Sequence, residues 1–174
     1  MIDSFDVWKV GLLVAAVLVL GLYLAMTAGR LDRLHVRHDA AVASLELQFA
    51  LRAEAVAETI AEGLIDPVSA GLLARALAAR RTDGPMQVAA EGELSALIRE
   101  VVEAHDGIVG PPEIQQGLRS ACNRVAFAHA FLDEAVDATL EMRHRPFIKY
   151  LGLAGHTAYP RRVPCDVAVP SFTD

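Results

Sequence analysis

The pattern of the chain begins with one long apolar segment. Residues 10–29 form a run of twenty residues without a charge, VGLLVAAVLVLGLYLAMTAG, between Lys9 and Arg30. This length matches the ~20 residues that an α-helix needs to cross the hydrocarbon core of a bilayer. The run exceeds the apolar part of a cleaved signal peptide, and its N-terminal flank carries Asp3 and Asp6 against Lys9 alone. The segment therefore predicts a retained, single-pass transmembrane helix.

The apolar helix is expected to continue without a break into a long amphipathic helix. Between Ala28 and Glu62, the one residue that disfavours a helix is Gly29. Apolar or small residues recur there with the three-and-four spacing of one helix face, at Leu31, Leu34, Ala41, Leu45, Phe49, Ala53, Val56 and Ile60. At ~1.5 Å per residue, residues 10–62 span about 80 Å, which projects a domain away from the bilayer.

Start and stop signals predict three more helices, over residues 67–80, 86–105 and 112–145. Asp66 and Pro67 supply the N-cap and first position of the second helix, on which Arg80 is expected to face outward. The last helix ends before Pro146, because proline disfavours α geometry in the preceding residue. One face of it comprises Ile114, Leu118, Cys122, Val125, His129, Leu132, Val136 and Leu140, beside a stripe of Phe127 and Phe131.

These elements define an all-α chain, in which an N-terminal single transmembrane helix continues into an antiparallel helical bundle of two long and two shorter helices. The predicted segments are residues 1–9 as a short non-cytoplasmic N-terminus, 10–29 as the transmembrane helix, 30–146 as the bundle, and 147–174 as an irregular tail packed on the end of the bundle. Arg30, Arg33 and Arg37 follow the apolar run, whereas Lys9 alone precedes it. The positive-inside rule therefore places the N-terminus outside the plasma membrane and the bundle in the cytoplasm.

Composition and motifs exclude several function classes. The formal net charge of −6 argues against nucleic-acid binding, which normally requires a basic surface. The sequence has no P-loop, no dinucleotide-binding glycine pattern, no HExxH and no nucleophile elbow. Cys122 and Cys165 are too few for a disulfide framework and have no zinc-type spacing. We therefore predict no catalytic, cofactor-binding or metal-binding residues, and a protein that is not an enzyme.

Asn123 and Arg124 are a polar pair on the otherwise apolar last helix. A charge pair between Arg124 and Glu54, on the other long helix, is expected to fix the register of the two helices, as single polar groups do in some packed bundles. The alternative is a recognition role for Asn123 and Arg124 at the bundle surface.

Small residues recur within the apolar run. Gly21, Ala25 and Gly29 lie at i, i+4 and i+8, a ladder that allows two helices to approach closely in lipid. The ladder predicts a face for self-association of the anchor. The alternative is the ordinary abundance of Gly and Ala in membrane helices.

Motifs on both long helices are shared with a known family. Residues 123–128, Asn-Arg-Val-Ala-Phe-Ala, resemble an N-R-I-A-[YF]-A motif, and residues 132–136, Leu-Asp-Glu-Ala-Val, resemble a Y-N-D-A-V segment. Pro146 and the apolar FIKYLGL after it are similar to a P-S-N-L-I-A-x-x-F-G-F ending, and Gln48, Arg52 and Glu54 stand at positions that resemble Q-L-x-x-R-x-D. These motifs belong to the LemA family of bacterial membrane proteins. The resemblance implies an N-terminal anchor and a helical bundle, and it leaves the function open, because no enzymatic activity is established for the family.

The sequence thus predicts a membrane-anchored helical scaffold or protein-interaction module of the bacterial plasma membrane. Its expected partners are the lipid bilayer and another membrane or cytoplasmic protein, or a second copy of itself. The alternative is a membrane-tethered metal- or ligand-binding sensor, or an enzyme, with its site between the helices. Cys122 and His129 are the first candidates for such a site, because residues seven apart share one helix face.

Overall fold

The computed structural model describes residues 4–80, 85–104 and 110–144, together with residues 162, 163, 165, 167, 169 and 170. It contains four helices, α1 (Ser4–Ala61), α2 (Pro67–Ala79), α3 (Pro85–Ala104) and α4 (Pro112–His144). The prediction of an all-α chain is confirmed for these residues, and α2, α3 and α4 begin and end within one residue of their predicted bounds. Of the predicted terminal segments, residues 1–3, 147–161, 164, 166, 168 and 171–174 lie outside the described residues.

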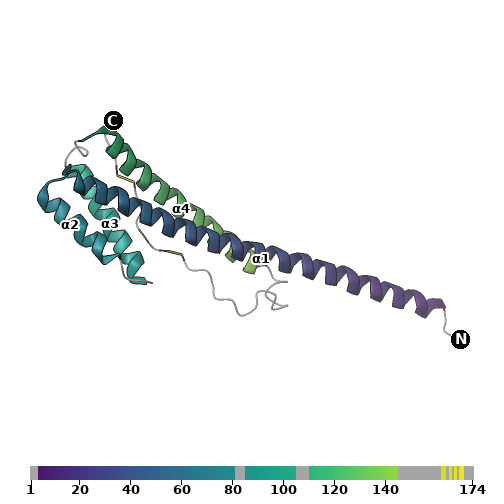
Figure 1. Cartoon of the computed structure of the whole chain (residues 1–174). Coiled ribbons are helices and arrows are strands. Elements are labelled where there is room, and N and C mark those ends of the chain that lie inside the picture. The colour runs from purple at the N-terminus through teal and green to yellow at the C-terminus, as the bar shows by residue number, and fades with distance from the viewer. Residues whose placement is uncertain are drawn as a thin grey trace.

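α1 is one uninterrupted helix that extends far beyond the other three (Figure 1). Its 58 residues correspond to about 87 Å at ~1.5 Å per residue. Its N-terminal part exposes a continuous series of large apolar side chains, among them Leu12, Leu13, Val17, Leu18, Val19 and Leu22. By length and composition this helix is able to cross a membrane.

The connection from α1 to α2 follows the predicted capping chemistry. Gly63 has a φ of +67°, a left-handed conformation that glycine adopts at little cost after a helix end. The Asp66 carboxylate accepts hydrogen bonds from the backbone N–H groups of Val68 and Ser69 at 2.9 and 3.0 Å. Pro67 occupies the first turn, so the predicted start of the second helix is confirmed.

α4 packs antiparallel to the C-terminal half of α1 (Figure 1). Arg37 of α1 lies beside Glu134 near the end of α4, whereas Val56 shares a cluster with Leu118 near its start. That cluster draws on all four helices through Val56, Leu73, Ala76, Leu94, Ile98, Val101, Val102, Leu118 and Cys122. A second cluster joins Leu45 and Phe49 to Val125, Ala128, Leu132, Val136 and Cys165. The long helices thus bury the apolar faces that their spacing predicts.

The described tail residues lie against the side of α4, not on the end of the helices as expected. The His129 ring bonds through Nε2 to the carbonyl oxygen of Val163 at 2.8 Å, and Arg162 forms an ion pair with Asp137. Cys165 is buried in the second cluster, and a Cβ atom at Gly92 of α3 would lie 3.9 Å from its Sγ. The tail is packed here because α1 and α4 leave this side of their apolar cluster uncovered.

Candidate functional site

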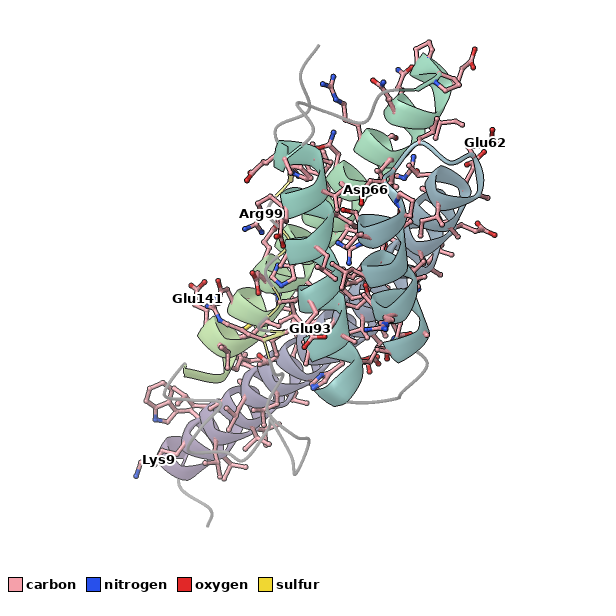
Figure 2. All side chains as sticks on the ribbon, turned by 90° about the vertical axis from the view of Figure 1, so that its left-hand side faces the viewer. Lys9, Glu62, Asp66, Glu93, Arg99 and Glu141 are labelled. Atoms are coloured by element: carbon pink, nitrogen blue, oxygen red, sulfur yellow. The ribbon has the colours of Figure 1, made fainter. Side chains whose placement is uncertain are left out.

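Four side chains from three helices form a buried charge cluster: Arg52 on α1, Arg80 at the end of α2, and Glu91 and Ser95 on α3. Arg52 is 2% exposed and Glu91 is 0% exposed, whereas Glu93, two residues further along α3, is exposed (Figure 2). The Glu91 carboxylate accepts hydrogen bonds from Arg52 at 2.7 Å through one oxygen and from Arg80 through the other. One buried carboxylate therefore faces two guanidinium groups.

Further hydrogen bonds hold the buried charge cluster together. Arg52 Nη1 donates to Ser95 Oγ at 2.7 Å, and that hydroxyl donates to the backbone carbonyl of Glu91 at 2.8 Å. The Arg52 guanidinium also lies 5.4 Å from the centre of the Phe49 ring. Both terminal nitrogens of Arg52 are bonded, whereas its Nε is buried without a hydrogen-bond partner among the described residues. Buried polar groups that are bonded in this way favour one alignment of the helices that carry them. The cluster connects α1, α2 and α3 and has the geometry of a structural element.

The predicted pair between Arg124 and Glu54 is not formed. Arg124 donates to Ser120 Oγ on its own helix at 2.8 Å. Glu54 is exposed and lies beside Leu77 and Arg80 of α2. The reason is geometric, because Glu54 lies two positions after Arg52 and so points about 200° away around the helix.

The other predicted site residues lie on separate parts of the molecule. Asn123 is half-buried on α4, and Gly21 and Ala25 are exposed on α1. Gly29 is half-buried, and its backbone carbonyl accepts a hydrogen bond from Arg33 Nε at 3.1 Å. The prediction that Arg80 faces outward is wrong, because its side chain turns inward to Glu91.

An open groove runs between α1 and α4, with a volume of about 400 Å³. Phe127 and Phe131 form one wall and are 72% and 60% exposed, so the stripe that they form faces solvent. Arg37 and Arg124 border the groove, and its remaining lining is Ala40, Ala41, Ser44, Gln48, Ala128 and Ala135. We refer to these ten residues as the aromatic groove. Arg37 is paired with Glu134 at 3.2 Å, which leaves Arg124 as the guanidinium without a carboxylate beside it among the described contacts. Small side chains, two aromatic rings and this guanidinium suit an apolar group that also carries negative charge.

Cys122 and His129 do not converge on a site. Burial raises the pKa of the Cys122 thiol to about 11, against a smaller lowering effect of the nearby Arg52 charge. The thiol is therefore protonated at neutral pH and a poor nucleophile or metal ligand. His129 contacts the tail carbonyl of Val163 and lies 3.4 Å from the Asp133 carboxylate. Among the described residues, no group of three or more His, Cys, Asp or Glu side chains is placed to hold a metal ion.

Comparison of the chain with protein-family models, with curated proteins and with solved structures finds no match. In the part of the chain that the structure describes, the protein is all-α, with four helices, of which one is long and apolar enough to cross a membrane.

Proposed function

We propose that this chain is a LemA-like, single-pass protein of the bacterial plasma membrane whose antiparallel helical bundle acts as a scaffold or protein-interaction module, without catalysis of its own. The observation that carries the proposal is the pair of exposed phenylalanines, Phe127 and Phe131, on the aromatic groove. Exposed aromatic side chains beside a concave apolar surface are typical of binding sites for other proteins.

The proposed occupant of the aromatic groove is an amphipathic helix that carries acidic residues, from another membrane or cytoplasmic protein. A groove between two packed helices accepts a third helix through its apolar face. Arg37 and Arg124 border this groove, and Arg37 is paired with Glu134 at 3.2 Å. Arg124, which bonds to the neutral Ser120 hydroxyl, is therefore the guanidinium that favours a negatively charged partner locally in a chain whose net charge is −6. Phenylalanine and arginine together supply the buried ring and the charge-assisted hydrogen bonds that dominate such interfaces.

The anchor gives the aromatic groove a defined position. Arg37 lies eight residues after Gly29, which corresponds to about 12 Å along a continuous helix. Because α1 continues through both segments without a break, the groove is held at a fixed height above the bilayer. A partner bound there is positioned at the membrane surface, which is the role of a scaffold.

The test of the groove uses full-length protein in native membranes with a photo-activated cross-linking residue in place of Ser44, an exposed residue of the groove lining. Partners that are cross-linked are identified by mass spectrometry in three backgrounds: native, F127A/F131A, and V68A/L72A. The last pair removes exposed apolar side chains from α2, away from the groove. We expect F127A/F131A to lower recovery of a defined partner at least about tenfold, the effect of losing hot-spot side chains, while V68A/L72A retains it. Equal recovery in all three backgrounds contradicts the proposal.

Orientation is tested separately by thiol labelling of intact cells. Cys165 is buried against α4 and is unsuitable as a probe, so we place the probe at the exposed position Ala130→Cys with Cys122→Ala and Cys165→Ala. Protection from an impermeant reagent until the cells are opened is the expected result for a cytoplasmic bundle. Immediate labelling would place the bundle outside and direct the search for partners to the cell envelope.

A further inference from the structure

α1 carries a second, largely apolar face that the other described helices leave exposed, although Leu77 and Arg80 of α2 border its C-terminal part. Val36, Ala40, Ala43, Leu47, Ala50 and Ala57 follow one another at alternating intervals of four and three residues, with Glu54 at the remaining position. We refer to these seven positions as the α1 seam. All of them are exposed, and Val36 and Leu47 are 64% and 57% exposed. The opposite face of α1, with Leu45, Phe49 and Val56, packs on the rest of the chain.

The same spacing continues into the apolar half of α1. Counting back from the α1 seam, it passes through Arg33 and then Leu12, Ala15, Val19, Leu22, Met26 and Gly29, of which only Gly29 is not fully exposed. The repeat thus persists for about six heptads, the pattern that brings two α-helices together along one line. A helix that packs only against its own domain needs one apolar face, whereas α1 has two.

We propose that a second copy of this chain packs its α1 in parallel against the α1 seam, forming a dimer whose contact is continuous from the membrane into the bundle. This inference rests on the proposed function in one respect, namely that both copies are anchored in the same bilayer. The shared anchor fixes both helices in the same direction and at the same height. Each position of the α1 seam then meets its own counterpart, which is the arrangement of a parallel coiled coil.

Side-chain size and charge fit this arrangement. The α1 seam is rich in alanine, and Gly29 precedes it, so the two backbones can approach closely. With Ala40 and Leu47 at the first core position of the heptad, Asp32 and Arg37 occupy the two flanking positions that lie opposite each other in a parallel dimer. Asp32 of each copy therefore faces Arg37 of the other, whose guanidinium also pairs with Glu134 of its own chain at 3.2 Å. At the core positions of Arg33 and Glu54 each charge meets its own counterpart, so these two positions oppose the dimer and the apolar positions between them must outweigh that cost.

Disulfide cross-linking of full-length protein in native membranes tests the dimer. Single cysteines are introduced with Cys122→Ala and Cys165→Ala, at the seam position Ala43→Cys and at the matched exposed position Ala130→Cys on α4. Under mild oxidation we expect a covalent dimer from Ala43→Cys at least about tenfold more abundant than from Ala130→Cys, because only seam positions bring two thiols within disulfide distance. Equal yields, or no dimer from Ala43→Cys, would overturn the proposal.

A charge reversal tests the register. Asp32→Arg should lower the dimer yield of Ala43→Cys, and D32R/R37D should restore it, because the second change re-forms the opposite pairs. Self-association through Gly21, Ala25 and Gly29 alone predicts cross-links within the apolar run and no effect of either charge change, and that result would also overturn the proposal. This readout contains only this chain, so its failure is distinct from a failure of partner capture at the aromatic groove.

Discussion

Arg52 of α1 and Glu91 of α3 form an ion pair with an N–O distance of 2.7 Å in the interior of the protein. The two residues are 39 positions apart in the sequence, and both side chains are almost completely buried. Arg80, at the end of α2, binds the second oxygen of the same carboxylate. One acidic side chain therefore joins three helices.

Replacing that acidic side chain is expected to be strongly destabilising. Glu91→Gln keeps the shape of the side chain but leaves the two guanidinium groups of Arg52 and Arg80 buried without a counter-charge, which costs about 3–5 kcal/mol of unfolding free energy. The matched control is Glu93→Gln on the exposed side of α3, where a change within about 0.5 kcal/mol is expected. Denaturant unfolding in detergent micelles, followed by circular dichroism, measures both. Similar losses of unfolding free energy in the two variants would mean that the ion pair does not stabilise the alignment of the helices.

The sequence predicted the helices better than it predicted this cluster. The apolar spacing located the faces of α1 and α4, and the turn signals located Asp66 and the helix bounds, because both are local properties. The charged pair was assigned to Arg124 and Glu54, since helix periodicity does not show which helices are neighbours.

A signal for the buried charge cluster was nevertheless present. Arg52 lies on the stripe of Leu45, Phe49 and Val56, and Glu91 lies on the stripe of Leu94 and Ile98. Opposite charges interrupting two apolar stripes indicate a buried pair, because a lone charge there is too costly to bury. The exposure of Phe127 and Phe131, by contrast, depends on which side of α4 the other helices cover, which local spacing does not determine.

The buried thiol of Cys122 makes stability depend on pH in the alkaline range. Its pKa is raised from 9.0 to about 11 in the folded state, so its contribution is complete below pH 9 and is lost as the pH rises toward 11. At pH 10 the unfolding free energy should be about 1.4 kcal/mol lower than at pH 7 from this group alone. The measurement is the difference between the native protein and Cys122→Ala at both pH values. An equal alkaline loss in both would show that the thiol is not responsible.

Two glycines in similar surroundings are expected to respond oppositely to alanine. A Cβ atom at Gly63 or at Gly71 meets no other atom within 4 Å, so only the backbone distinguishes the two positions. Gly63→Ala places alanine at a φ of +67° and should cost about 1 kcal/mol. Gly71→Ala lies within α2 and should stabilise by about 0.5–1 kcal/mol. Thermal unfolding of the two variants checks the signs, and a loss at Gly71 would contradict the assignment of a regular helix there.

The contact between His129 and Val163 is expected to hold the tail against α4. His129→Phe keeps a ring of similar size but removes the 2.8 Å hydrogen bond to the Val163 carbonyl, leaving that oxygen without this partner. A buried hydrogen bond contributes about 0.5–1.5 kcal/mol, so the tail should open up to about tenfold more often.

Cys165, which the tail buries beside α4, reports the opening through its rate of reaction with a thiol reagent in a Cys122→Ala background. Ala130→Phe, at an exposed position of the same helix, is the control and should leave the rate unchanged. Faster labelling in His129→Phe with unchanged helicity would show that this hydrogen bond holds the tail over the second apolar cluster. Unchanged labelling would mean that the apolar contacts of Cys165 and its neighbours are sufficient to hold the tail.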